Sequence, residues 1–208
     1  MKFDYLVQHI QSTSTHFQQN AIKAVNIHLT LRNWLVGFYI VEFEQKGEDR
    51  ADYGSNMLPA LAKKISIKGL GETSLKVCRQ FYQAYSKMLP FLNEDFKQII
   101  PLQISRTASD EFSLPENNHY LPKLFKSVSF SHFAELIKIA DPLKRKFYEL
   151  LILKTTPSIK ELERQIATLT YERLGLSGNH ETAFAEIQQK INPAQPSDAV
   201  KSIYFLTF

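Results

Sequence analysis

A long amphipathic segment occupies residues 18–45, where apolar side chains recur mostly every three or four positions and no proline interrupts them. The recurring residues are Ile22, Val25, Leu29, Trp34, Leu35, Phe38 and Val41. This spacing is the period of one helix face, so the segment is predicted to be one helix that ends near Lys46 and Gly47. Residues 3–10 are predicted to form a separate, shorter helix, because the hydroxyl-bearing run from Ser12 to Thr15 favours a turn.

Two further helical patterns lie close together, at residues 55–67 and 72–89. The apolar face of the second consists of Leu75, Cys78, Tyr82, Tyr85 and Leu89. Between the two patterns, residues 68–71 read Lys-Gly-Leu-Gly and predict a tight turn, because glycine accepts positive φ. Two helices joined by a short glycine turn, the second with Lys, Arg and Gln facing outward, are typical of a helix-turn-helix unit.

The rest of the chain contains an irregular stretch and a second group of helices. After a short helix at 93–100, the polar, acidic residues 101–119 predict an irregular connection, with a short strand or wing near 102–104. Helical patterns then recur at residues 129–139, 141–154, 158–174 and 183–191. Asp141, followed by Pro142, and Ser158, followed by Glu161, are predicted N-caps.

These elements predict a mainly α protein with two lobes. The first lobe, residues 1–100, combines the long helix with the helix-turn-helix or winged-helix-like unit. The second lobe, residues 120–208, is a small helical bundle, and residues 101–119 connect the two.

Basic charge is concentrated in two blocks, although the whole chain of 208 residues carries a net charge of only +4. Residues 60–90 contain six Lys or Arg against one Glu, and residues 120–175 contain ten basic residues against six acidic ones. Clustered basic side chains on one element attract phosphate, whereas scattered ones only keep a protein in solution. The first block coincides with the predicted helix-turn-helix unit.

We predict that both blocks contact double-stranded DNA. Lysines supply salt-dependent contacts with phosphates, and Arg or Gln side chains form paired hydrogen bonds with guanine or adenine edges. The predicted contacts in the first block are Lys63, Lys64, Lys68, Thr73, Lys76, Arg79, Gln80 and Gln83. Those in the second block are Lys144, Arg145, Lys160 and Arg164.

Three alternatives stay open at this point, the weakest of which is a cryptic enzyme with a metal held near Glu42 or Asp110. Either block can be an ordinary solvated helix face, because basic residues on amphipathic helices often serve solubility. The chain as a whole can also be a protein-interaction or dimerisation module, including a homodimer. Exposure of Trp34, Phe38 and Tyr39 on the long helix would be the sign of such a partner surface.

No residue pattern predicts catalytic or metal-binding chemistry. The six histidines never lie three or four positions apart, and Cys78, the single cysteine, falls on an apolar helix face. A lone cysteine excludes an intramolecular disulfide, and no stretch approaches the ~20 apolar residues that span a bilayer. We therefore expect a cytoplasmic, non-enzymatic protein with no cofactor, no metal and no membrane segment.

Linked motifs run along most of residues 20–176. The first group comprises Val25-Asn26, Trp34, Gly37, Ile40-Val41-Glu42, Gln45, Tyr53-Gly54, Lys68-Gly69, Leu75 and Arg79-Gln80-Phe81-Tyr82. The second comprises Phe130-Ser131-His132, Asp141-Pro142, Lys144-Arg145-Lys146-Phe147-Tyr148, Leu162-Glu163-Arg164-Gln165-Ile166 and Tyr171-Glu172-Arg173-Leu174. Together they resemble the amino-terminal domain of the YhcG family of bacterial proteins. The resemblance implies a helical, winged-helix-like DNA-binding domain, normally followed by a PD-(D/E)XK nuclease domain, with a role in DNA transactions and mobile-element defence.

The sequence departs from the family pattern at three places. Gly71 and Ser74 stand where the family usually has a serine cap and an asparagine, and Pro157 replaces a tryptophan. The last residues, 203–208, resemble the junction after which the nuclease domain begins. The resemblance therefore implies a binding module whose catalytic nuclease domain is absent from this chain and which would position such a nuclease on DNA.

Overall fold

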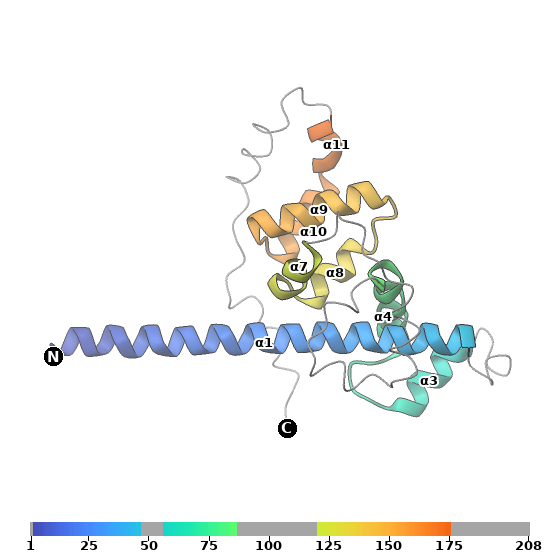
Figure 1. Cartoon of the computed structure of the whole chain (residues 1–208), viewed down its shortest axis with the longest axis horizontal. Helices are drawn as coiled ribbons and strands as arrows, with labels where there is room; N and C mark the ends of the chain where they lie inside the picture. Colours follow the sequence, from blue (N-terminus) through green and yellow to red (C-terminus); the bar gives the residue numbers. More distant parts are fainter. Residues whose placement is uncertain (1, 47–55, 87–119, 176–208) are drawn as a thin grey trace. The chain divides into compact units, whose positions relative to one another are not determined.

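The structure is a computed structural model that describes residues 2–46, 56–86 and 120–175. Within these ranges the chain forms eight α-helices and no strand, which confirms the mainly α class (Figure 1). The helices are α1 (Phe3–Lys46), α3 (Met57–Ile65), α4 (Glu72–Ala84), α7 (Leu121–Ser127), α8 (Phe130–Leu136), α9 (Pro142–Thr155), α10 (Ile159–Ala167) and α11 (Thr170–Gly175). The predicted helices at 93–100 and 183–191 and the predicted wing near 102–104 lie outside the described residues.

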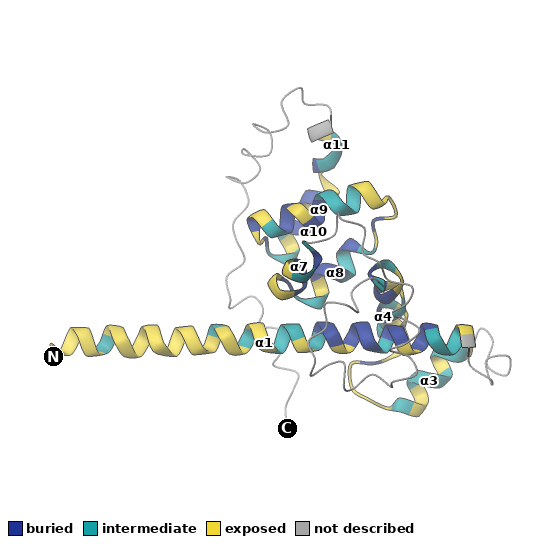
Figure 2. Cartoon of the chain, viewed as in Figure 1, coloured by how far each residue is buried: buried dark blue, intermediate teal, exposed yellow. Residues whose placement is uncertain are grey.

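Helix α1 is continuous over 44 residues, so the prediction of two helices separated by a turn is wrong. The Ser/Thr run lies inside the helix. The Ser12 hydroxyl donates to the carbonyl oxygen of His9 at 3.1 Å, one turn earlier, and therefore bonds along the helix instead of ending it. Burial changes along α1: most of residues 3–28 are exposed, whereas most of residues 30–41 are buried (Figure 2).

The chain divides into two compact units, and the division falls within α1. One unit is the continuous segment Leu31–Phe125, and the other combines Met1–Thr30 with Lys126–Phe208. The connection expected at residues 101–119 lies outside the described residues, so the lobe boundaries drawn from the sequence remain a prediction.

In the unit Leu31–Phe125, α4 packs closely against the second half of α1. The helices approach at Gly37, where a Cβ atom would lie only 2.0 Å from the carbonyl oxygen of Cys78. Trp34 is completely buried beside this contact, and its Nε1 donates to the carbonyl oxygen of Tyr85 at 2.9 Å. Phe38 is 1% exposed, and its ring lies 5.4 Å from that of Tyr82. Two of the three residues offered above as signs of a partner surface therefore belong to the core.

The sequence pattern does not predict helix α7, which begins directly after the irregular stretch. Its residues Leu121, Leu124 and Phe125 are buried. The Phe125 ring stacks on that of Phe81 at a centroid distance of 5.7 Å, so α4 uses Phe81 as well as the predicted apolar face.

The second unit contains the bundle of α8 to α11, and both predicted N-caps are confirmed there. The Asp141 carboxylate accepts from the backbone N–H groups of Leu143 and Lys144, at 2.8 and 3.3 Å. The Ser158 hydroxyl oxygen accepts from the N–H of Glu161 at 3.2 Å. These local hydrogen bonds fix where α9 and α10 begin.

The helix predicted over residues 158–174 is two helices. Helix α10 ends at Ala167, Leu169 takes the left-handed conformation with φ 53°, and α11 begins at Thr170. The buried Tyr148 hydroxyl donates to the carbonyl oxygen of Gln165 at 3.2 Å and accepts from the N–H of Tyr171 at 3.4 Å. One α9 side chain thus binds the helices on both sides of the break.

Candidate nucleic-acid interface

The turn between α3 and α4 is held by a buried leucine. Ser66 caps α3 in the left-handed conformation with φ 48°, and Gly69 has φ 87°, so the chain reverses over residues 66–71. Leu70, in the middle of this turn, forms a core cluster with Ile40 and Leu75. The turn therefore has six residues instead of the four predicted. Its buried residue, Leu70, packs against Ile40 of α1 and Leu75 of α4.

Helix α4 presents a polar stripe on the side opposite its core face. Thr73, Lys76, Gln80 and Gln83 are all exposed, and their spacing of three or four residues places them on one face. The core face contains four buried residues: Leu75, Cys78, Phe81 and Tyr82. An exposed stripe of this composition has the hydrogen-bonding groups that read base edges in a major groove.

The other predicted lysines of this unit lie on the end of α3 and in the turn. Lys63 and Lys64 fall in the last turn of α3, where positive charge also suits the helix dipole, and Lys68 follows two residues after its cap. All three are exposed. The described segment 56–86 contains five Lys or Arg against one Glu, so its surface is locally positive.

Arg79, the remaining member of the first predicted set, is engaged within the protein. Its Nη1 donates to Oε1 of Glu44 on α1 at 2.7 Å, and the two side chains are 29% and 32% exposed. Its Nε is buried and has no hydrogen-bond partner among the described residues. Arg79 thus ties α4 to α1 and lies beside the polar stripe instead of within it.

The sequence analysis missed Glu44, although a signal for it exists. Gly37, Val41 and Glu44 are spaced four and three residues apart, so they share the face of α1 that meets α4. An acidic side chain at the end of this packed face meets α4, and of the two basic residues of α4, Lys76 and Arg79, it is Arg79 that pairs with Glu44.

The second predicted set lies in the other unit, and three of its four members bond to their own unit. Lys144 forms an ion pair with Glu172 at 2.5 Å, and this hydrogen bond raises the pKa of Lys144 and lowers that of Glu172. Arg145 donates from Nε and Nη2 to the carbonyl oxygen of Ile139, at 3.1 and 2.8 Å. These contacts join α9 to α11 and to the end of α8.

Arg164 and Lys160 complete this second set. Arg164 is exposed but donates to both carboxylate oxygens of Glu161, at 2.8 and 2.6 Å. Lys160 is exposed and forms no ion pair with another described residue. Three of the four basic side chains of the second set are thus engaged by groups of their own unit.

The described residues include no cluster of metal-ligating side chains and no accessible thiol. Cys78 is fully buried, and desolvation raises the pKa of its thiol to about 11, so it stays protonated as the predicted core thiol. No group of three His, Cys, Asp or Glu side chains within the described ranges could hold a metal ion. None of the helices described is long and apolar enough to cross a membrane.

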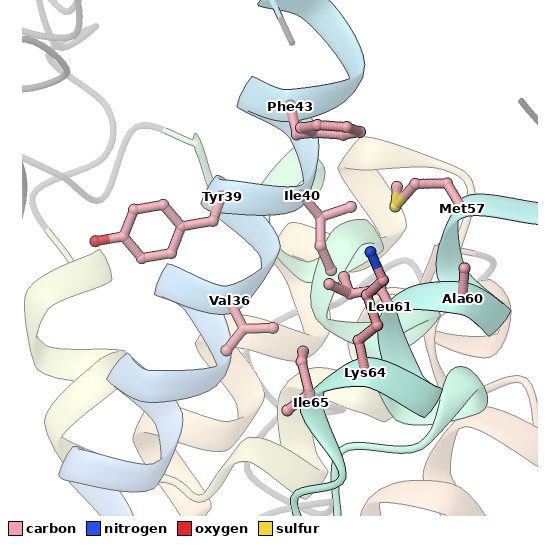
Figure 3. Close-up of a pocket in the computed structure, with 9 residues that line it drawn as sticks. All are labelled: Val36, Tyr39, Ile40, Phe43, Met57, Ala60, Leu61, Lys64 and Ile65. Atoms are coloured by element: carbon pink, nitrogen blue, oxygen red, sulfur yellow. The ribbon is translucent and has the colours of Figure 1, made fainter. Parts of the chain in front are cut away.

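An apolar groove of about 400 Å³ lies between α1 and α3 (Figure 3). It is lined by Val36, Tyr39, Ile40, Phe43, Met57, Ala60, Leu61, Lys64 and Ile65. Lys64 is the only charged residue among these nine, so the groove lacks the paired polar groups that bond-breaking chemistry needs.

Comparison with known proteins finds similarity along most of the chain. Residues 9–173 match the DUF1016 N-terminal domain. The chain belongs to the DUF1016 N-terminal domain family. Within it, the chain is 29% identical over 190 residues to the protein named "Putative nuclease YhcG" of Escherichia coli (strain K12). The aligned region covers 90% of this chain and 50% of that protein, so the chain spans about half the length of its curated relative. No solved structure matches the chain.

Membership of the DUF1016 N-terminal domain family confirms the resemblance inferred from the motifs. The matched region begins in the first half of α1 and ends within α11, so it includes every helix that carries a predicted contact residue.

Proposed function

We propose that this chain is a DNA-binding, non-catalytic module that positions a YhcG-type nuclease on duplex DNA. The observation that carries the proposal is the exposed stripe Thr73, Lys76, Gln80 and Gln83 on α4, bordered by exposed lysines of α3 and the turn. The name of the relative supports the association with a nuclease, and the part of that protein aligned here is only half of its length.

The arrangement divides affinity and recognition between different side chains. Lys63, Lys64 and Lys68 would contact phosphates, which supply most of the affinity and its salt dependence. Gln80 and Gln83 would reach base edges from α4, because a glutamine side chain can form two hydrogen bonds with adenine. The buried Leu70 holds the turn on the core, so the lysines and the helix keep one spacing along the duplex.

Salt-dependent binding tests the proposal. The variant Lys68→Ala/Lys76→Ala removes two predicted phosphate contacts, and Lys123→Ala/Lys138→Ala removes the same charge from exposed lysines outside the predicted sets. We expect the first variant to lower the slope of log K against log salt by roughly two, since each phosphate contact contributes about 0.9. Fluorescence anisotropy with a labelled duplex at several salt concentrations measures both slopes.

Three outcomes decide the matter. If only Lys68→Ala/Lys76→Ala lowers the salt slope, with unchanged thermal unfolding, the result supports α4 and its turn as the interface. If both variants lower the salt slope equally, only net charge matters and the assignment of a site is overturned. A wild-type protein without salt-dependent affinity for duplex DNA refutes the proposed function.

The glutamines are tested separately, through sequence preference. A binding-site selection from random duplexes gives the preference of the wild type, and the same selection with Gln80→Ala should relax one or two positions. A selected sequence that is identical for the two proteins would show that Gln80 does not read bases.

Protein interaction is the second candidate function, and one observation favours it on a different surface. Trp34 and Phe38 are buried, but Phe3, Ile10 and Phe17 in the first half of α1 are exposed. Self-association through these residues is compatible with DNA binding, because none of them belongs to the predicted DNA-contacting sets.

A further inference from the structure

The first half of α1 is mostly exposed among the described residues (Figure 2). It carries an apolar stripe. The stripe follows alternating steps of four and three: Phe3, Val7, Ile10, Ser14, Phe17, Ala21 and Ala24. Phe3, Ile10 and Phe17 are 76%, 60% and 67% exposed. This is the a/d pattern of a two-stranded coiled coil, in which a partner helix covers such a seam.

The same helix face is buried further along α1. Continuing the steps of four and three from Ala24 passes the exposed His28 and then reaches Leu31, Leu35 and Phe38, whose exposed fractions are 6%, 8% and 1%. One helix face is therefore core in its second half and exposed in its first half. Serine and threonine at four successive positions weaken the exposed half as an isolated helix, so a covering partner would stabilise it.

We propose that residues 3–24 pair with the same residues of a second copy as an antiparallel coiled coil. Phe3 and Phe17 alone expose roughly 300 Å² per copy, since a phenylalanine buries about 150–250 Å². Standard interfaces cover about 800 Å² per partner, and Val7, Ile10, Ser14 and the two alanines add to the area that the phenylalanines supply. The segment contains only two charged residues, Asp4 and Lys23, and neither belongs to the stripe, so pairing buries no charge.

The sizes of the side chains favour the antiparallel orientation. When the residue numbers of facing positions add up to 24, Phe3 faces Ala21, Val7 faces Phe17 and Ile10 faces Ser14. Each large side chain then meets a smaller one, and the two helix dipoles oppose each other. A parallel pair would place each of Phe3 and Phe17 against its own copy and would leave a gap where Ala21 faces Ala21.

The proposed pairing is tested by measuring the oligomeric state of the full chain in solution. We expect light scattering to give twice the 24.0 kDa of one chain. Ile10→Asp/Phe17→Asp should raise the dimer Kd at least about 100-fold, because two buried apolar side chains per copy become charged. Gln8→Asp/Thr15→Asp adds the same charges to exposed positions on the opposite side of α1 and should remain dimeric.

Two outcomes overturn the pairing. A wild type that is monomeric at 100 µM excludes it, and if Ile10→Asp/Phe17→Asp then lowers the Tm more than the control does, the chain covers the stripe with its own residues. A dimer that both variants preserve is formed by another surface.

Single cysteines test the orientation. Thr13 lies close to its own copy only in the antiparallel pair, because there it faces residue 11 of the partner, two positions from the partner's Thr13. Ala21 lies close to its own copy only in a parallel pair. Oxidation should therefore cross-link Thr13→Cys and leave Ala21→Cys monomeric on a denaturing gel, and the reverse result refutes the antiparallel arrangement. Cys78 is buried in both proteins and serves as a constant background.

Discussion

Arg79 on α4 donates through Nη1 to the Glu44 carboxylate on α1, at 2.7 Å. This pair places a negative charge beside the polar stripe that is proposed to approach DNA. Glu44→Gln should raise affinity for duplex DNA severalfold, because it removes that charge and releases Arg79 toward phosphate. It should lower the free energy of unfolding by about 1 kcal/mol or less, since the pair is partly exposed.

The matched control for this prediction is Glu42→Gln, which removes the same charge two residues earlier on α1. Anisotropy titrations at one salt concentration compare the two variants, and urea unfolding measures their stability. An equal rise in affinity for both variants would mean that the effect is general electrostatics and does not pass through Arg79.

Gly37→Ala should destabilise the unit Leu31–Phe125. The new Cβ would lie 2.0 Å from the carbonyl oxygen of Cys78 and 2.9 Å from Cβ of Tyr82, so α4 would have to move away from α1. Overpacking of this kind costs about 1–3 kcal/mol. Urea unfolding followed by Trp34 fluorescence measures the loss.

Gly71→Ala makes the same chemical change where nothing lies within 4 Å of the added Cβ. It should alter the free energy of unfolding by less than ~1 kcal/mol, as expected for an N-cap glycine. If both variants lose the same amount, the close approach of α1 and α4 at Gly37 is not what makes glycine necessary there.

The bundle of α8 to α11 should lose stability in acid through His132. Burial lowers the pKa of His132, and hydrogen bonds with the backbone of Pro157 and Ser129 oppose this only in part. The Pro157 carbonyl oxygen, 3.0 Å from Nε2, only accepts, so Nε2 carries the proton of the neutral ring. The unfolded chain then binds more protons than the folded one below pH 6.5.

The stabilising contribution of neutral His132 is therefore complete above pH 6.5 and is lost as the pH falls toward the lower folded value. His132→Gln should have a smaller loss of unfolding free energy between pH 7 and pH 5 than the wild type. His16→Gln, on the exposed part of α1, should retain the wild-type pH dependence. Urea unfolding at several pH values checks both variants, and identical curves for wild type and His132→Gln would contradict the prediction.

Thr156→Gly should stabilise the end of α9. Thr156 is exposed and takes the left-handed conformation with φ 42°, which is costly for a β-branched residue and free of strain for glycine. We expect a gain of about 0.5–1 kcal/mol in the free energy of unfolding, measured by urea titration. Thr168→Gly is the opposite control, because Thr168 has φ −85° and its hydroxyl donates to the carbonyl oxygen of Arg164, so glycine there should destabilise.

The caps of α9 and α10 were predictable from the sequence because Asp141 and Ser158 bond only to residues two or three positions away. The break at Leu169 was not, because no glycine or proline marks it. It depends on contacts between helices, such as the one between the Tyr148 hydroxyl and the N–H of Tyr171. Sequence patterns thus predict caps whose hydrogen bonds span one turn of helix, whereas a helix break that depends on tertiary hydrogen bonds is not visible in them.

The candidate site shows the same limit. The periodic spacing of Lys76, Gln80 and Gln83 was sufficient to predict an exposed stripe. The engagement of Arg79 was not predictable in this way, because its partner Glu44 is 35 residues earlier in the chain. A helix period shows which face is polar, whereas the partner of a side chain at the edge of that face depends on which helix packs beside it.

The division of the chain within α1 has a consequence for its synthesis. The unit Leu31–Phe125 is one uninterrupted segment, so all its residues are translated before the first residue of the bundle of α8 to α11. The other unit is assembled from the first 30 residues and from those after Phe125, so it can be completed only after Leu31–Phe125 has been translated. The core around Trp34 and Gly37 can thus form first, and the nascent chain would carry the proposed DNA-contacting helix on that core before the bundle of α8 to α11 is complete.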